Sequence, residues 1–359
     1  MGSVNAYGKI SKVRFAKPSQ TFDNKKILFA TGTWDEERNN TLMLWGSKEI
    51  PLGLNNNHES SFELYPVAKV NHKGDIMEMR FIDDNILLTS SSEGYFNAFK
   101  CLPYITSEQE DSDFRIENYQ IEHIIAHQFH HFSENKSAPA TGIAIEPNSG
   151  NDPEIVSVGE DGRLVLFNLS KEMQCQIVDS ADVSGIKTVA WPSTDLIITI
   201  GISGQLKLFD RRKPGNPSIF YDLSRPRDTF NCLAVNSSQV NQIAAGSSEG
   251  FVTIWDIKNL EEPVKRARPH DIHVNELIFH PHRPGFLFSC SEDGTIGIMD
   301  FGGSIGGNVR SEMYRENGLI RRYCHEGNDI AINSIDYNSQ NKLLIGGGDG
   351  RNLLWTQFE

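Results

Sequence analysis

One short pattern recurs along the chain and limits the folds that it can adopt. In residues 246–256 a Ser-Ser-Glu-Gly turn leads into alternating apolar residues that end at Trp255 and Asp256. Glycine supplies the positive φ that a tight hairpin needs, and the alternation is typical of a half-buried β-strand. The unit occurs six times, with its turn glycines at Gly94, Gly162, Gly204, Gly250, Gly294 and Gly350.

The spacing of these glycines identifies the kind of repeat. Successive glycines are 68, 42, 46, 44 and 56 residues apart, so the base period is in the mid-forties and two intervals contain insertions. A period of about 40–45 residues with a Trp-Asp ending resembles the WD40 repeat, which forms a four-stranded blade. The bulky residues that end the third strands are Trp45, Phe99, Phe167, Phe209, Trp255, Met299 and Trp355, and the acidic WD40 positions are Asp256, Asp293 and Asp300.

Counting strands predicts how the ring closes. Seven inner strands and seven third strands can be assigned, but only six internal outer strands, at 61–70, 118–126, 172–179, 217–223, 263–270 and 318–325. The seventh outer strand must come from residues near Ser3 to Tyr7, so that no sheet edge is left open at the junction. We therefore expect residues 1–359 to form one all-β, seven-bladed propeller, with surface insertions at about 101–139 and 302–318.

Composition excludes several classes of protein. The formal net charge of −13 opposes direct nucleic-acid binding, which depends on Lys and Arg neutralising phosphate. No apolar run is long enough to span a bilayer, and the N-terminus has no apolar core of signal-peptide type. Five cysteines without close spacing favour a reduced, intracellular protein without zinc. We expect no cofactor and no membrane insertion.

The histidines allow two interpretations. Four of them are close in sequence, but their spacing matches no metal signature, and we interpret the group as part of a solvated loop; they are His123, His127, His130 and His131. Three others precede inner strands, where WD40 proteins often bond a His to a buried Ser or Thr and a hairpin Asp; they are His72, His270 and His325, with Asp293 and Asp349 as candidate acidic partners. We interpret the second group as structural.

Candidate functional residues point to binding and not to catalysis. No nucleophile turn of the Gly-x-Ser-x-Gly type and no phosphate-binding Gly-rich loop is present in the sequence. A basic group stands out on this acidic chain, either as ordinary solvated charge or as a docking patch for an acidic partner; it consists of Arg211, Arg212, Lys213, Arg225, Arg227, Lys265, Arg266 and Arg268. Trp34 and Asp35, in the long first hairpin, join Arg211 and Arg212 as candidate partner-binding residues.

The first hairpin carries a more specific resemblance. The segments 9–15 and 29–45, the latter reading FATGTWDEERNNTLMLW, are similar to the opening of the small WD-repeat nucleoporin of the Y-shaped outer-ring complex of the nuclear pore. Similar segments follow in the same blade order at 71–81, 153–167, 204–210 and 280–296. Departures from the family lie in 46–70, 101–139 and 302–323.

The resemblance implies a function. It implies a non-catalytic scaffold subunit that supports pore assembly and nucleocytoplasmic transport of protein and mRNA, located at the nuclear envelope. Its partners would be other Y-complex nucleoporins, above all an α-helical solenoid subunit of the short arm, with a mitotic kinetochore role as in animal relatives. The alternative is a substrate receptor of a cullin ubiquitin ligase, suggested by the relaxed Trp-Asp-x-Arg motif at residues 209–212.

Overall fold

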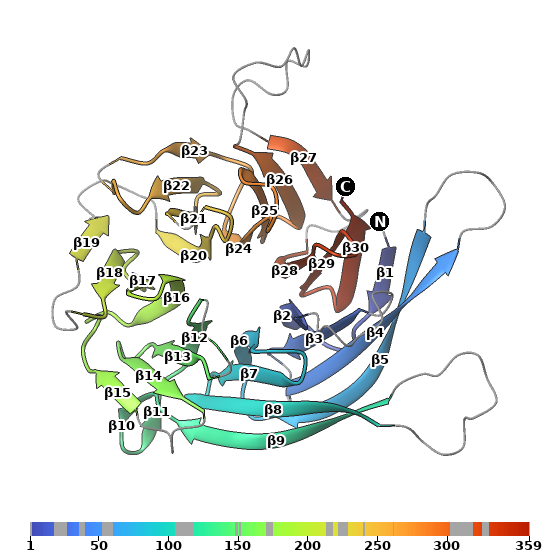
Figure 1. Cartoon of the computed structure of the whole chain (residues 1–359), viewed down its shortest axis with the longest axis horizontal. Helices are drawn as coiled ribbons and strands as arrows, with labels where there is room; N and C mark the ends of the chain where they lie inside the picture. The colour runs from blue at the N-terminus through green and yellow to red at the C-terminus, as the bar shows by residue number, and fades with distance from the viewer. Residues whose placement is uncertain are drawn as a thin grey trace, which may run out of the picture.

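The computed structural model of the chain contains seven four-stranded antiparallel sheets arranged around a central axis (Figure 1). It describes residues 2–17, 27–35, 40–51, 60–104, 118–147, 150, 152–169, 175–212, 218–221, 229–239, 241–260, 262–301, 319–324 and 330–358. Among these residues, no helix has the length and apolar character needed to cross a bilayer. The predicted all-β, seven-bladed propeller is confirmed.

Each blade runs from an inner strand at the axis to an outer strand at the rim. Blade 1 contains β2 (Ile10–Phe15), β3 (Leu28–Thr33), β4 (Asn40–Pro51) and β5 (Ser60–His72); blade 2 contains β6 (Ile76–Phe81), β7 (Ile86–Ser91), β8 (Tyr95–Tyr104) and β9 (Asn118–Gln128); blade 3 contains β12 (Ala140–Ile145), β13 (Glu154–Gly159), β14 (Leu164–Asn168) and β15 (Cys175–Val178). Blade 4 contains β16 (Ile186–Ser193), β17 (Leu196–Gly201), β18 (Leu206–Asp210) and β19 (Ser218–Tyr221); blade 5 contains β20 (Phe230–Val235), β21 (Gln242–Ser247), β22 (Val252–Asp256) and β23 (Lys265–Ala267); blade 6 contains β24 (Val274–Phe279), β25 (Phe286–Ser291), β26 (Thr295–Asp300) and β27 (Leu319–Cys324). Blade 7 contains β28 (Ile332–Asn338), β29 (Leu343–Gly348), β30 (Asn352–Gln357) and β1 (Gly2–Asn5), and a small hairpin of β10 (His131–Ser133) and β11 (Lys136–Ser137) joins blades 2 and 3. All six internal outer strands overlap their predicted ranges.

The N-terminal strand closes the ring. β1 pairs antiparallel with β30, from Gly2 opposite Trp355 to Asn5 opposite Asn352, so the two chain ends lie in one sheet (Figure 1). Gly2 is required there, because a Cβ on it would lie 2.3 Å from carbons of the Trp355 indole. Closure by an N-terminal outer strand is confirmed, although Tyr7 lies outside the strand, in a left-handed conformation (φ 64°).

The turn glycines behave as predicted in five of the six repeats. Five of the six predicted turn glycines have φ between 74° and 83°; they are Gly94, Gly162, Gly204, Gly250 and Gly294. In blade 7 the left-handed residue is Arg351 (φ 57°) and not Gly350. The assignment of positive φ to Gly350 is therefore wrong, because the turn is displaced by one residue.

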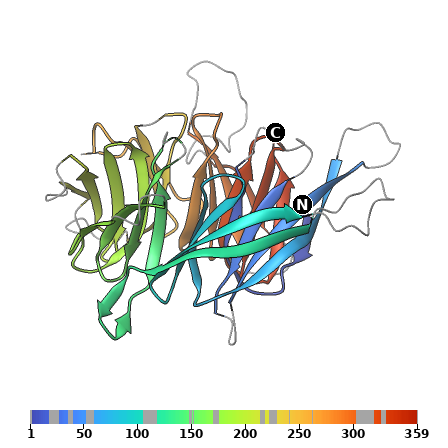
Figure 2. The same ribbon diagram turned by 60° about the horizontal axis from the view of Figure 1, so that its bottom comes forward.

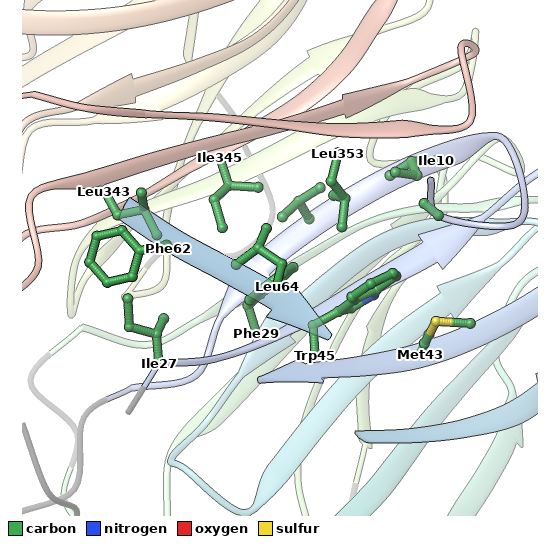
Figure 3. Packing of buried hydrophobic residues seen from close by; sticks show 12 residues of the cluster. Ile10, Ile27, Phe29, Met43, Trp45, Phe62, Leu64, Leu343, Ile345 and Leu353 are labelled. Atoms are coloured by element: carbon green, nitrogen blue, oxygen red, sulfur yellow. The ribbon is translucent and has the colours of Figure 1, made fainter. Parts of the chain in front are cut away.

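The junction between blades 7 and 1 is packed like the rest of the core. Figure 3 shows side chains of β3, β4 and β5 meeting those of β29 and β30, with Trp45 at the centre. The Trp45 indole lies parallel to the Phe29 ring at 6.1 Å between centroids, and its Nε1–H donates to Thr31 Oγ1 at 2.9 Å. An apolar interface therefore holds the junction together in addition to the β1–β30 pairing.

Blades 1 and 2 carry longer outer hairpins than the other blades. β4 and β5 have 12 and 13 residues and β8 and β9 have 10 and 11, and both hairpins extend beyond the disc (Figures 1 and 2). Much of the predicted insertion at 101–139 is therefore regular structure: residues 101–104 extend β8, and residues 118–137 supply β9, β10 and β11. Residues 105–117 and the predicted insertion at 302–318 lie outside the described residues.

Buried histidines tie loops to blades. In blade 6, His270 lies with Nε2 2.7 Å from Ser289 Oγ and with Nδ1 3.2 Å from Asp293 Oδ2, as expected. Blade 3 has the same arrangement at His130, with Nε2 2.9 Å from Ser157 Oγ and Nδ1 2.9 Å from Asp161 Oδ1. A carboxylate only accepts, so Nδ1 donates to the aspartate in both blades, and Nε2 faces the serine hydroxyl. The solvated-loop interpretation of His130 is wrong, because its side chain is fully buried.

Blades 2 and 4 depart from this arrangement. His72 Nδ1 donates to the Gly74 carbonyl and Nε2 lies 2.9 Å from Thr89 Oγ1, with no acidic partner for His72 in the described residues. In blade 4, Asp182 replaces the histidine and lies 2.8 Å from Lys207 Nζ. Thr199 Oγ1, at the position of Ser157 and Ser289, is buried without a hydrogen-bond partner in the described part of the chain. His325 lies outside the described residues.

The other predicted WD40 positions lie as follows. The predicted bulky positions of six third strands are buried, at Trp45, Phe99, Phe167, Phe209, Trp255 and Met299, whereas Trp355 is half-buried beneath β1. In blades 1 and 2 the third strand continues past this position, to Pro51 and Tyr104. Asp256 Oδ1 accepts the Lys258 N–H at 2.9 Å and so shapes the turn after β22. Asp300 ends β26 opposite Phe286.

Candidate protein-interaction surface

One side of the propeller is formed by two sets of loops. Strand direction alternates within each blade, so the turns between second and third strands lie on the same side as the loops that enter the inner strands. We call this side the hairpin face. Among the described residues, its exposed large apolar side chains are Tyr7, Trp34, Phe132, Val183, Ile202, Ile272 and Ile330. Exposed aromatic and apolar side chains that gather on one face are a typical feature of docking surfaces.

Three of these side chains come from loops that meet at the junction of blades 7 and 1. Tyr7 is 69% exposed, Trp34 36% and Ile330 38%. Trp34 donates its indole N–H to Asp349 Oδ1 at 3.1 Å, which ties the blade 1 hairpin to the blade 7 hairpin. Ile330 approaches the neighbouring Gly350, where a Cβ would lie 3.5 Å from its side chain. We call Tyr7, Trp34 and Ile330 the seam patch.

Charged groups fix the hairpin that carries Trp34. Lys9 Nζ lies 2.5 Å from Asp35 Oδ2, and this hydrogen bond raises the pKa of Lys9 and lowers that of Asp35. The Asp35 N–H donates to Asp75 Oδ1 at 2.9 Å, while Asp35 itself adopts a left-handed conformation (φ 53°). The structure therefore brings the predicted pair Trp34 and Asp35 together at one exposed site, with Trp34 presented by a hairpin that is held from both sides.

The predicted basic residue Arg211 joins two blades. Its guanidinium forms ion pairs with Glu154 and Glu146 of blade 3 and lies 5.1 Å from the centre of the Trp191 ring. The ion pairs and the ring contact occupy the guanidinium within the molecule. Arg211 therefore has a structural role and links blade 4 to blade 3.

Arg212 is more exposed but is also paired. Its Nε and Nη2 donate to the two carboxylate oxygens of Asp210 at 2.8 and 2.7 Å, and Asp195 lies 3.8 Å away. The hydrogen bonds that Arg212 donates to Asp210 raise the pKa of Arg212. In the Trp-Asp-x-Arg interpretation this arginine enters an adaptor protein, whereas here its bidentate donors are directed at Asp210. Lys213, Arg225 and Arg227 lie outside the described residues.

A buried ionic network at the centre of the ring was missed by the sequence analysis. Arg14 on β2 is only 4% exposed, and its Nη2 lies 2.6 Å from Glu78 on β6 and 2.5 Å from Glu276 on β24. Its Nη1 donates to Ser334 Oγ on β28, which in turn donates to Glu276. Lys12 adds a second positive charge 3.9 Å from each glutamate. One arginine of blade 1 therefore contacts blades 2, 6 and 7.

The network sets the charge state of its carboxyl groups. Burial by itself would raise the pKa of Glu78, but the Arg14 guanidinium lowers it to about 2, and the pKa of Glu276 is lowered in the same way. Asp336, which accepts the Phe15 N–H at 2.7 Å, has a raised pKa because burial outweighs the attraction of Arg14. The centre of the ring is thus occupied by ionised glutamates around the Arg14 guanidinium, which links blades 1, 2, 6 and 7.

The remaining histidines of the predicted cluster each contact a different partner. His123 Nε2 lies 3.2 Å from Asn97 Oδ1, His127 stacks on Phe129, and His131 contacts Arg163. Within the described residues, no group of three or more His, Cys, Asp or Glu side chains is arranged to hold a metal ion. The candidate site therefore consists of the exposed apolar side chains of the seam patch and the charged groups that hold their loops.

Comparisons with known proteins identify the family. The model described as "WD domain, G-beta repeat" matches residues 261–300, which contain β23 to β26. Human Nucleoporin Nup43 is 32% identical over 294 residues, which are 81% of this chain and 73% of the human protein, and mouse Nucleoporin Nup43 is 31% identical over 86% of this chain and 78% of its own length. A Dictyostelium discoideum protein, "Nuclear pore complex protein nup43", is 28% identical over 53% of this chain and 48% of its own length. The resemblance predicted from the first hairpin is therefore confirmed, and the chain belongs to the Nup43 family of WD-repeat nucleoporins.

Proposed function

We propose that this nucleoporin is a non-catalytic scaffold subunit of the Y-shaped outer-ring complex, where it supports pore assembly and the transport of protein and mRNA. Membership of the Nup43 family makes it a nuclear pore protein with nucleoporin partners. Its fold supports a binding role, because propellers present rigid loop surfaces. A role at mitotic kinetochores belongs to the same proposal.

The partner that we propose is an α-helical solenoid nucleoporin of the short arm, bound by the seam patch. The observation that carries this proposal is the exposure of Tyr7, Trp34 and Ile330 on loops that the Trp34–Asp349 hydrogen bond and the Lys9–Asp35 ion pair hold in place. Trp and Tyr side chains that are fixed before binding lose little entropy and often carry most of an interface's binding energy.

Affinity purification from native extract with quantitative mass spectrometry tests the proposal. We expect short-arm nucleoporins to co-purify with the wild type, and the double variant Tyr7→Ala/Trp34→Ala to lose at least tenfold of them, since two anchors cost about 1–3 kcal/mol each. Ile177→Ala is the control, because Ile177 is an apolar side chain whose 51% exposure lies between those of Tyr7 and Trp34, but it lies on the outer strand of blade 3. Equal recovery with the double variant would contradict docking through the seam patch.

The same experiment tests the ligase alternative. That reading predicts a cullin adaptor in the wild-type sample, its loss on Arg212→Glu, and no outer-ring nucleoporins in either sample. We expect Arg212→Glu to leave nucleoporin recovery largely unchanged, because Arg212 already donates both of its bidentate bonds to Asp210.

A further inference from the structure

The charge of the chain is unevenly distributed. The whole sequence has a formal net charge of −13, yet residues 205–268 contain ten Lys and Arg against seven Asp and Glu. This segment supplies β18 and β19 of blade 4 and all of blade 5. One sector of the propeller therefore carries charge of the opposite sign to the molecule as a whole.

The positive side chains of blade 5 concentrate on its outer strand. Lys265, Arg266 and Arg268 are all exposed, and Arg266 lies opposite Thr253 in the β22–β23 register. Residues paired in this way share one face of the sheet, and alternate residues follow them, so Arg266 and Arg268 lie on the face that also carries Phe251. Their guanidinium carbons lie 4.0 and 5.4 Å from the centre of the Phe251 ring. We call Phe251, Lys265, Arg266 and Arg268 the blade 5 edge.

Backbone carbonyls hold two of these side chains without neutralising them. Arg268 donates to the carbonyls of Glu249 and Asp271 at 3.1 and 3.2 Å, and Lys265 Nζ donates to the carbonyl of Phe301 at 2.6 Å. In the described part of the chain, neither Arg268 nor Lys265 has a carboxylate within 4.0 Å. Carboxylates of the molecule itself pair with Arg14, Arg211 and Arg212. The charges of Arg268 and Lys265 are therefore fixed in position and available to a ligand.

The same strand has no neighbour on its outer side among the described strands. β23 is the last strand in the order β20-β21-β22-β23, and the adjacent Val264 is 53% exposed. An unpaired strand edge offers backbone hydrogen bonds to an extended segment, and the side chains beside it select the sequence. Basic side chains beside an open edge select acidic residues.

We propose that the blade 5 edge binds an extended, Asp- and Glu-rich segment of a partner protein, which lies along β23 with its carboxylates at Lys265 and Arg268. A nucleic acid would share the attraction to these cations, but the remaining surface, with its large negative charge, repels a long polyanion. A short acidic peptide segment avoids that repulsion. The blade 5 edge lies apart from the seam patch, so one propeller would join two partners at once.

The test uses a fluorescein-labelled octapeptide of alternating Thr and Glu, measured by fluorescence anisotropy against the full chain at 50 mM salt. We expect saturable binding that weakens as salt rises, and a loss of at least tenfold in affinity for Lys265→Glu/Arg268→Glu. Lys69→Glu is the matched control, since Lys69 is an exposed lysine on the outer strand of blade 1. Lys265→Gln/Arg268→Gln removes the charges without reversing them and should also weaken binding. It replaces the charge-reversed variant in the test if that variant does not fold.

Four results would overturn the proposal. The first is equal affinity of the folded Lys265/Arg268 variants and the wild type, and the second is an equal loss with Lys69→Glu. The third is equal binding of a single-stranded oligonucleotide at the same site. A peptide with proline at alternate positions, which cannot donate backbone hydrogen bonds, should bind at least several-fold more weakly, and equal binding would refute the placement along β23.

Discussion

Arg14 offers the sharpest test of how the ring is held closed. The variant Arg14→Met keeps much of the side-chain volume and removes the charge, so Glu276 is left buried beside Lys12, and Glu78 beside Lys12 and Arg80. Removing one partner of a buried ionic network costs about 3–5 kcal/mol, because the remaining charges lose their compensation. We therefore expect Arg14→Met to be among the most destabilising single substitutions in the inner strands.

The expected shift in melting temperature follows from the chain length. Unfolding entropy of about 2.1 cal/mol/K per residue gives roughly 0.75 kcal/mol/K for a chain of this size, so a loss of 3–5 kcal/mol corresponds to about 4–7 °C in Tm. Differential scanning calorimetry at pH 7 measures this directly. The triple variant Arg14→Met/Glu78→Gln/Glu276→Gln should recover most of the loss, since the two buried glutamate charges that lost Arg14 are removed as well. A shift below about 1 °C for Arg14→Met, or a triple variant less stable than Arg14→Met, would refute the reasoning.

Acid provides a second measurement of the same network. The folded-state pKa of Glu78 is lowered to about 2 and that of Glu276 is also lowered, against an unfolded value of about 4.3. A lowered carboxyl pKa contributes stability that is present above the unfolded pKa and is lost as pH falls through the folded pKa. The stability difference between wild type and Arg14→Met should therefore shrink from pH 5 towards pH 2. A difference that stays constant over this range would contradict the assignment.

Three further predictions follow from other contacts. Deleting residues 1–8 removes β1 from the edge of β30 and should lower the calorimetric Tm by several degrees, whereas an unchanged Tm would contradict closure by this strand. In urea denaturation, Thr199→Val should be neutral or stabilise the fold by up to about 1 kcal/mol, because the buried hydroxyl has no partner in the described residues. Thr31→Val should destabilise it by about 1–2 kcal/mol, because it removes the acceptor of the Trp45 indole N–H. A larger loss of stability for Thr199→Val than for Thr31→Val would contradict this reasoning. Burial by itself would raise the pKa of Asp161, but the hydrogen bond from His130 lowers it, so the contribution to stability is present above an unfolded pKa of about 3.9 and is lost as pH falls through the lowered folded pKa. Asp161→Asn should therefore be destabilising at pH 7 and progressively less so in acid, and a pH-independent effect would count against the bond.

Local sequence patterns predicted the elements that depend on neighbouring residues. Turn glycines, strand alternation and the count of outer strands were enough for the seven blades and for closure by the N-terminus, because hairpins form between residues close in sequence. His130 was misread because three other histidines surround it in sequence. A better signal was available: Ser157 and Asp161 follow His130 in the order in which Ser289 and Asp293 follow His270, with Asp four residues after Ser in both.

The network around Arg14 could not be predicted in this way. Its two glutamates are 64 and 262 residues away in sequence, and only the closed ring brings blades 1, 2, 6 and 7 to one point. The same limit applies to Arg211 and Arg212, whose positive charge is visible in the sequence while the acidic partners of Arg211 come from the neighbouring blade. Exposure of Tyr7 and Ile330 likewise depends on loops from both chain ends.

The most direct test of the account is the location of the protein in living cells. A fluorescent fusion expressed from its own locus should form a continuous rim at the nuclear envelope in interphase, because a nucleoporin scaffold subunit is retained there by its partners. The folded Tyr7→Ala/Trp34→Ala variant should become diffuse, while Ile177→Ala should keep the rim. A diffuse wild-type signal at native expression would contradict the central claim that this propeller is a docked component of the pore.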